Sequence, residues 1–323
     1  MNWLAMKTTM SFLQSASWSE CMPELPEVET VRSGLEQAWV GRTIIEVILR
    51  RDGLRFPFPE NMANVLTGAK VESVRRRAKY LLIDTNNGYV FLSHLGMSGR
   101  YTLITSSEVP TYSEHSAGPA HSKFGKLTGF DGRHDHMEFR FDDGSVAVYT
   151  DPRRFGIADV FERAEEPIQS LLEHLGPEPL EQWNADDAAR RCQGKRSPIK
   201  TTLLDQRFVV GVGNIYACEA LHRSGISPTR MTYSLVRKNG KPTKDLTRLV
   251  KEVKEVLRAA IEVGGSTLND FAAVDGTLGY FGHHFQVYDR EDGPCLKDGC
   301  NGTIERITQS NRSTFLCPRC QKK

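Results

Sequence analysis

The stretch Pro23-Glu24-Leu25-Pro26-Glu27-Val28-Glu29-Thr30 organises the rest of the chain. It predicts the start of a helix, because Pro26 suits a first helical position and the glutamates after it suit the positive end of the helix dipole. That interpretation leaves Pro23 and Glu24 without a role. If Met22 were removed, Pro23 would carry a free secondary amine, which can attack an aldehyde-level carbon and form an iminium. Glu24 would then lie one residue away, where a carboxyl group can transfer protons.

The composition is that of an ordinary globular protein. With 323 residues, 39% of them hydrophobic and 25% charged, the chain is long enough for two or three domains. A net charge of +2 does not by itself indicate a nucleic-acid-binding protein. Two local clusters are strongly basic, Arg75-Arg76-Arg77-Ala78-Lys79 and the segment from Arg190 to Lys200, which contains no acidic residue. Taken alone, either cluster is as typical of a solvated surface as of a binding site.

Residues 1–22 predict neither a membrane anchor nor a secretory signal. They hold one lysine and no continuous apolar segment, and no apolar run elsewhere approaches the length of a membrane span. We therefore expect residues 1–22 to be a leader that results from a start site placed too early. Cys21, Cys192 and Cys218 are scattered, as in a reduced protein, and we predict a cytoplasmic protein that does not enter a membrane.

The first half of the chain predicts a β domain, residues 23–160, that begins with a helix. Segments of alternating, β-branched character follow that helix, and Asn87-Gly88 and Asp143-Gly144 are typical of hairpin turns. The Ser-, Gly- and Pro-rich stretch from Gly99 to Arg133 has no usable period and predicts a long surface loop.

The second half predicts a helical domain, residues 181–287, after a linker at 161–180. Ser197-Pro198 is typical of a helix start, and a second helix from Ile215 to Ser224 should end at Gly225. Apolar residues at helical spacing then predict a long amphipathic helix that ends at Gly264-Gly265.

The remaining residues, 288–323, carry two cysteine pairs with four and two intervening residues. Paired cysteines in a short polar segment that cannot build its own core predict one Zn²⁺ ion held by Cys295, Cys300, Cys317 and Cys320. Four thiolates leave no open coordination position, so this zinc would be structural. Thr303 to Thr314 should form a β-hairpin with Arg312 at or near its tip.

Six motifs then occur in a fixed order, and together they resemble bacterial formamidopyrimidine-DNA glycosylases from Met22 to the end. They are Met22-Pro23-Glu24-Leu25-Pro26-Glu27-Val28-Glu29-Thr30, Arg76-Arg77-Ala78-Lys79-Tyr80, His94-Leu95-Gly96-Met97-Ser98-Gly99, Asp151-Pro152-Arg153-Arg154-Phe155-Gly156, Gly211-Val212-Gly213-Asn214-Ile215-Tyr216 and the cysteine tail. The resemblance implies an α+β multidomain fold with an N-terminal β-sandwich, a helix–two-turn–helix domain and a zinc finger.

The resemblance also implies an activity. Members of the family remove oxidised purines, such as 8-oxoguanine and formamidopyrimidines, and then nick the abasic site by β,δ-elimination. In this chain, the resemblance makes Pro23 the imine-forming nucleophile and Glu24 the proton donor and acceptor. Lys79 would transfer protons in β-elimination, and Arg312 would serve δ-elimination.

Damaged double-stranded DNA is the implied partner, bound by a monomer. His134, Arg153, Lys195, Lys200 and Asn214 match positions that contact DNA phosphates, and such contacts hold a strand whose base must leave the stack. We interpret both basic clusters as parts of this phosphate clamp. Met97, Arg153 and Phe155 resemble the trio that fills the space of the flipped nucleotide. Alone, Met97 and Phe155 would be more typical of core packing.

Three alternatives and one departure remain open at this stage. The related endonuclease VIII branch shares the Pro-Glu start but prefers oxidised pyrimidines, and a non-catalytic DNA-binding homologue would keep the helical domain and the finger. An RNA-binding zinc-ribbon protein fits only the tail. The first cysteine pair is wider than the usual two-residue spacing, which affects its geometry but not the ligand count. We expect His94 and His136 to be structural.

Overall fold

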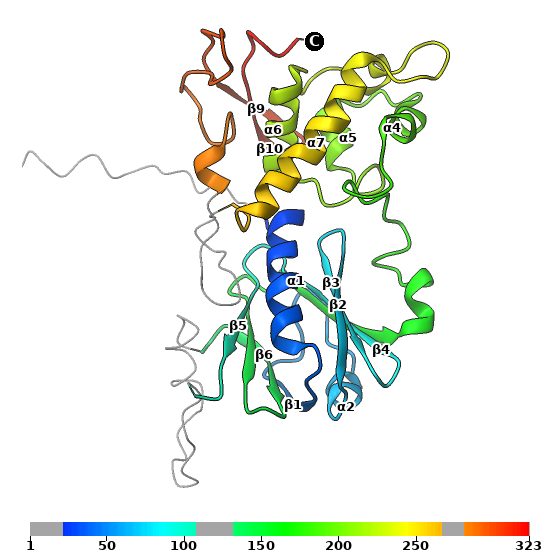
Figure 1. The fold of residues 1–323 in the computed structure, drawn as a ribbon, viewed down its shortest axis with the longest axis vertical. Coiled ribbons are helices and arrows are strands. Elements are labelled where there is room, and N and C mark those ends of the chain that lie inside the picture. The colour runs from blue at the N-terminus through cyan, green and yellow to red at the C-terminus, as the bar shows by residue number, and fades with distance from the viewer. Residues whose placement is uncertain (1–21, 108–131, 267–280, 323) are drawn as a thin grey trace, which may run out of the picture.

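The computed structural model describes residues 22–107, 132–266 and 281–322. Figure 1 shows a β-rich half and a helical half, with helix α1 (Leu25–Trp39) running from the β-rich half to their junction. The α+β multidomain fold is therefore confirmed. The expected leader, apart from Met22, and most of the expected loop lie outside the described residues.

The β-rich half consists of two four-stranded antiparallel sheets. One has the order β1 (Ile44–Leu49), β6 (Asp135–Phe141), β7 (Val146–Thr150) and β5 (Arg100–Ile104). The other has the order β2 (Val71–Arg77), β3 (Tyr80–Thr85), β4 (Tyr89–His94) and β8 (Ile157–Glu162), and the short helix α2 (Met62–Leu66) precedes it. The expected hairpin turns join β3 to β4 and β6 to β7.

Both sheets and α1 contribute to one apolar core. The indole of Trp39, at the end of α1, packs against the rings of Tyr101, Phe139 and Phe141, with centroids 5.0–5.7 Å apart. These rings come from α1, β5 and β6. The apolar alternation of the strands thus produces the predicted sandwich.

The predicted loop from Gly99 to Arg133 is wrong at its start. Arg100–Ile104 forms β5, an edge strand paired with β7, and Tyr101 lies opposite Tyr149. Tyr101 is buried and its hydroxyl donates to Ser93 Oγ at 2.8 Å. A five-residue strand offers too few alternations to stand out beside the polar segment that follows it.

Among the described residues, the helical half contains the three predicted α-helices, one further α-helix and two short 3₁₀ helices. After the 3₁₀ helix η1 (Arg163–Ile168) come α4 (Ala185–Cys192), α5 (Ile199–Leu204), α6 (Asn214–Ser224), the 3₁₀ helix η2 (Thr232–Leu235) and α7 (Lys244–Glu262). Gly225 ends α6 in the left-handed conformation, with φ of 69°. The apolar face of α7 is buried against α6 and the start of α1, which explains its helical period.

The C-terminal segment shares the core of the helical half. A short 3₁₀ helix, η3 (Phe281–His284), leads to it, and the hairpin consists of β9 (Glu305–Gln309) and β10 (Arg312–Leu316). Ile304 and Phe315 belong to the same buried cluster as α6 and α7. This arrangement agrees with the expectation that the segment has no core of its own.

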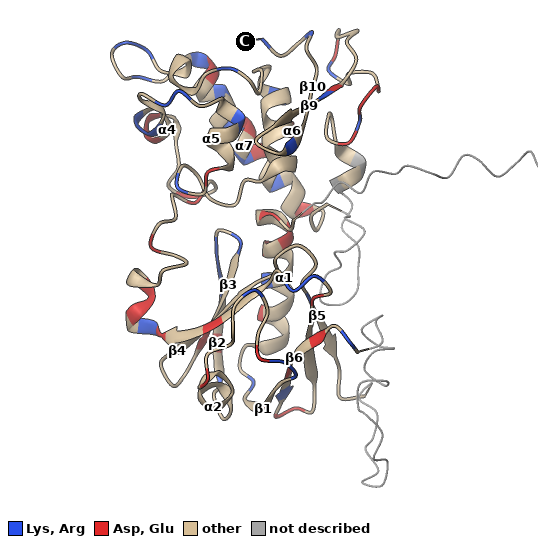
Figure 2. Cartoon of the chain, turned by 180° about the vertical axis from the view of Figure 1, so that it is seen from behind, with Lys and Arg blue, Asp and Glu red and all other residues tan. Residues whose placement is uncertain are grey.

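In the parts of the chain that the structure describes, no helix combines the length and the apolar character needed to cross a membrane. Figure 2 shows that basic and acidic residues are interspersed over both halves.

Candidate active site and nucleic-acid interface

The carboxyl group of Glu24 lies at the junction of the two halves, against the N-terminus of α6. Its Oε2 accepts from Gly213 N at 2.7 Å and its Oε1 from Ile215 N at 2.9 Å. These N–H groups have no partner within the helix, so a carboxylate stabilises the helix start. A side chain at Gly213 would have its Cβ 2.3 Å from the Glu24 carboxyl carbon, which explains the glycine at that position.

Burial raises the pKa of Glu24 to about 7, while Lys79 acts in the opposite direction and Glu27 adds to the rise. Both Glu24 and Lys79 are buried. A carboxyl group with this pKa exchanges protons readily near neutral pH, which is what a general acid or base requires. The structure therefore brings Glu24 and Lys79 together.

A second buried carboxylate, Glu27, connects α1 to the helical half. Its Oε1 accepts from the Tyr216 hydroxyl at 2.6 Å and from Ser266 N and Oγ at 2.8 and 2.7 Å. Its Oε2 accepts from Glu24 N at 2.9 Å. Glu27 thus fixes the backbone beside Pro23, a role that goes beyond the helix-dipole effect that its position in the sequence suggests.

Lys79 is part of the turn between β2 and β3, which the carboxylate of Glu178 holds in place. Glu178, which is buried, pairs with Arg76 at 2.8 Å and with Arg77 at 2.9 Å, and accepts from Ala78 N at 2.7 Å. Ala78 is left-handed, with φ of 55°. The expected linker, which contains Glu178, therefore secures the turn that presents Lys79.

The interpretation of the first basic cluster as a phosphate clamp is wrong for its arginines. Arg75 pairs with Asp84 and Glu166 at 2.6 and 2.8 Å, and Arg76 also pairs with Glu29. In the second cluster, Asp187 pairs with both Arg190 and Arg191. The partners of Arg75–Arg77 include Glu178, about a hundred positions away, so no local pattern in the sequence indicates these ion pairs.

Lys200 and Asn214 meet at the hairpin of the C-terminal segment. Lys200 is fully buried, and its Nζ donates to Ser313 O at 3.1 Å and Thr314 Oγ1 at 2.6 Å. Asn214 Nδ2 donates to the same Ser313 carbonyl at 2.9 Å. The side chain of Arg312, one residue earlier, is exposed at the start of β10.

The charges of Arg312 and Glu24 both affect the pKa of Lys200. Burial lowers the pKa of Lys200, the charge of Arg312 lowers it further, and Glu24 has a smaller opposite effect. The structure therefore gathers Glu24, Lys79, Lys200, Asn214 and Arg312 from different segments around one junction.

Met97 and Phe155 lie on two turns that Asp151 ties together. The buried Asp151 accepts from Ser98 Oγ at 2.6 Å through Oδ1 and from Gly156 N at 2.9 Å through Oδ2. The turns touch at Gly96, where a Cβ would lie 2.4 Å from the Phe155 carbonyl carbon. Sequence reasoning assigned no role to Asp151, although the motif that begins with it was visible.

The side chain of Phe155 is not part of a core. It is 46% exposed, and the guanidinium of Arg153 lies 5.0 Å from the centre of its ring. An exposed phenylalanine on a turn held by a buried carboxylate is typical of a binding surface. Core packing is thus excluded for Phe155, while Met97 is half-buried.

The structure also describes the contacts of His134, Lys195, His94 and His136. His134 is half-buried beside the Phe155 turn, where its carbonyl accepts from Asp151 N at 2.9 Å. Lys195 lies 3.5 Å from Asp205. His94 Nδ1 accepts from Gly96 N at 2.9 Å, and burial lowers the pKa of His94 to about 4. His136 Nε2 bonds to Asp151 O at 2.8 Å, so both histidines support the turns, in line with the expected structural role.

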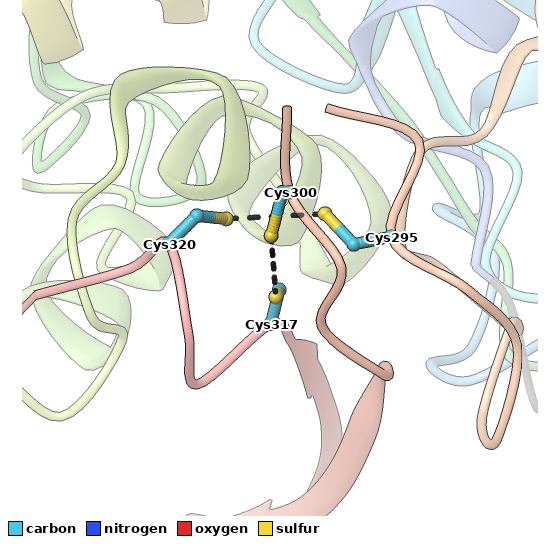
Figure 3. Close-up of side chains that lie close together, drawn as sticks. All are labelled: Cys295, Cys300, Cys317 and Cys320. Atoms are coloured by element: carbon cyan, nitrogen blue, oxygen red, sulfur yellow. Dashed lines mark hydrogen bonds between the residues drawn. The ribbon is translucent and has the colours of Figure 1, made fainter. Parts of the chain in front are cut away.

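The four cysteines of the tail form one cluster (Figure 3). All four sulfur atoms lie within 4.8 Å of one another, with Cys295 and Cys320 at 3.9 Å and Cys300 and Cys317 at 3.7 Å. Four thiolates arranged tetrahedrally around zinc are about 3.8 Å apart, because each Zn–S bond is about 2.3 Å. The residues fit one structural zinc ion, and the wider first pair does not change the ligand count.

Three family models match consecutive parts of the chain. They are the formamidopyrimidine-DNA glycosylase N-terminal domain at residues 22–158, the formamidopyrimidine-DNA glycosylase H2TH domain at 175–272, and the zinc finger found in FPG and IleRS at 293–323.

Curated relatives and solved structures indicate the same family as these models. Formamidopyrimidine-DNA glycosylase from Bradyrhizobium sp. strain BTAi1 is 47% identical over 302 residues, and that from Sinorhizobium fredii strain NGR234 is 48% identical over 307. Each alignment covers 93% of this chain and all of the relative. A structure of MutM in complex with DNA containing carbocyclic 8-oxo-G superposes with a TM-score of 0.76 at 30% identity, covering 93% of this chain and all of that one.

The fold and the junction site define a DNA glycosylase with a helical DNA-binding domain and a zinc finger. The chain belongs to the formamidopyrimidine-DNA glycosylase family, which acts in base-excision repair of oxidised purines.

Proposed function

We propose that Pro23, as a free N-terminal amine, attacks C1′ of an oxidised purine nucleotide in double-stranded DNA. The observation that carries this proposal is the position of Glu24, whose carboxyl is held on the N–H groups of α6 beside Lys79, one residue from Pro23. A proline nitrogen inside a peptide bond has no usable lone pair, so the active form begins at Pro23 after removal of Met22.

In the first step the lone pair of Pro23 forms a bond to C1′ while the glycosidic bond breaks and the base leaves. The base takes up the proton that the Pro23 nitrogen gives up. Glu24, whose pKa of about 7 keeps much of it protonated at neutral pH, donates a proton to O4′ as the C1′–O4′ bond breaks and the sugar ring opens. The resulting iminium makes the C2′ proton acidic, and Lys79 transfers protons as β-elimination breaks the C3′–O bond. Arg312, at the exposed tip of the hairpin, serves the δ-elimination that follows.

Phosphate contacts by His134, Arg153, Lys195 and Asn214 hold the strand while the damaged nucleotide leaves the stack, and the buried Lys200 supports them by holding the hairpin through Ser313 and Thr314. A pocket of about 530 Å³ beside the Phe155 turn extends this surface, with Arg51, Arg55 and Arg154 among its lining residues. In the part of the chain that the structure describes, these three form no ion pair with a carboxylate. They therefore suit phosphates.

We place the catalytic β domain at 23–160, the linker at 161–180, the helical domain at 181–287 and the finger at 288–323, and we propose that the protein acts as a cytoplasmic monomer on damaged duplex DNA. Release of 8-oxoguanine compared with thymine glycol tests the substrate class. Faster release of 8-oxoguanine supports the proposal, and faster release of thymine glycol would favour the oxidised-pyrimidine alternative.

Phe155→Ala and Met97→Ala remove the groups that fill the space of the flipped nucleotide and leave Pro23 and Glu24 in place. We expect both variants to slow excision of 8-oxoguanine from duplex DNA by roughly tenfold or more, since the cost of unpairing is a few kcal/mol. Cleavage at a pre-formed abasic site should change less. Single-turnover rates on the two substrates measure the difference, and equal losses on both would contradict the assignment.

A further inference from the structure

The buried imidazole of His222, near the C-terminal end of α6, is used by no step of the proposed mechanism. It is 2% exposed, and its Nε2 lies 3.2 Å from Cys295 Sγ. Its other ring nitrogen, Nδ1, is buried without a hydrogen-bond partner among the described residues. The ring therefore makes one directed polar contact, and that contact is with a zinc-binding cysteine.

The chemistry of the metal site fixes the direction of this hydrogen bond. A cysteine that binds zinc is a thiolate and can only accept. The hydrogen must therefore be on Nε2, which leaves Nδ1 as an unprotonated acceptor. The opposite tautomer would place a lone pair against the thiolate and also leave a buried N–H without an acceptor.

Glu219, three residues earlier on α6, makes a neighbouring contact with the same segment. Its Oε1 accepts from Val287 N at 3.0 Å and Tyr288 N at 2.9 Å, and its Oε2 from Gln286 N at 2.9 Å. These residues lead into the finger. Helix α6 thus contacts the segment before the finger through Glu219, and it contacts Cys295, the first zinc-binding residue of the finger, through His222.

We propose that His222 is a positioning residue of the zinc site: its Nε2–H donates to the Cys295 thiolate and fixes the first cysteine pair against α6. The same helix receives Glu24 at its N-terminus, eight residues away, so one rigid element sets both the catalytic carboxyl and the finger that carries Arg312. Zinc retention then depends on the helical domain as well as on the four cysteines. This inference does not depend on the glycosylase mechanism.

The test uses zinc release from the full chain to a colorimetric chelator, 4-(2-pyridylazo)resorcinol. His222→Phe keeps a ring but removes the donor, and we expect zinc affinity to fall by about 10- to 100-fold, as when other outer partners of metal ligands are removed. His222→Gln retains an N–H donor of sufficient reach and should recover part of the loss. Co²⁺-substituted protein should show a shifted thiolate-to-metal absorption band in the Phe variant and a smaller shift in the Gln variant.

His136→Phe is the matched control, because His136 is also a buried histidine with one hydrogen bond, to Asp151 O, but lies in the β domain. It should leave zinc release and the Co²⁺ spectrum unchanged. If His222→Phe fails to fold, His222→Asn replaces it, since its shorter amide should retain zinc less well than Gln. Wild-type retention and spectrum in the donor-free variant, or an equal effect of His136→Phe, would overturn the proposal.

Discussion

Glu24→Gln should abolish release of the damaged base while leaving the protein folded. The carboxamide has nearly the same shape and can still accept one hydrogen bond from the N–H groups at the start of α6. It can no longer transfer a proton, and loss of a positioned acid or base costs typically 10²- to 10⁴-fold in rate. Single-turnover excision of 8-oxoguanine measures the effect.

The control for this variant is Glu29→Gln on the same helix, because Glu29 pairs with Arg32 and Arg76 and lies outside the proposed chemistry. It should excise the base at close to the wild-type rate. Thermal unfolding of both variants shows that the fold is retained. A Glu24→Gln variant that releases the base within a factor of about three of wild type would contradict the role of Glu24 as proton donor.

Cys317→Ser should release the zinc and abolish binding to lesion-containing duplex DNA. Cys317 is fully buried, and the binding free energy of a structural zinc, on the order of 10 kcal/mol or more, is also folding free energy of the finger. Without the metal the hairpin loses the anchor that holds Arg312 and Ser313 beside Lys200 and Asn214. The β domain, whose core is separate, should remain folded.

Cys192→Ser is the control for this substitution, since Cys192 is a buried cysteine of α4 outside the zinc cluster. It should retain one zinc per chain and bind DNA. Zinc content by mass spectrometry of the native protein and affinity for a duplex that contains an abasic-site analogue give the two results. Normal DNA binding by zinc-free Cys317→Ser would show that the finger is not a DNA-binding element.

The sequence predicted the parts of the fold that depend on local pattern. Hairpin turns at Asn87-Gly88 and Asp143-Gly144, the helix closed by Gly225 and the cysteine spacing each reflect chemistry within a few residues. Strand β5 was not predicted, because five residues are too few to show a clear alternation of apolar and polar side chains.

Contacts between residues that are far apart in the sequence could not be predicted from it. The arginines of the first basic cluster proved to be partners of Glu29, Asp84, Glu166 and Glu178, and their charges are used within the protein. Lys200, expected at the DNA surface, is buried under the hairpin with its charge directed to Ser313 and Thr314. A basic residue in a sequence does not show whether its partner is a phosphate or a distant carboxylate.

Borohydride trapping on DNA that contains the lesion identifies the attacking nucleophile. Reduction of the iminium gives a stable covalent adduct, and peptide mapping of that adduct identifies the nitrogen that attacked C1′. We expect the adduct to lie on Pro23 as the first residue of the active chain, and Pro23→Gly to weaken trapping. A fully active protein that retains residues 1–22, with its adduct on Lys79 or another lysine, would contradict this expectation.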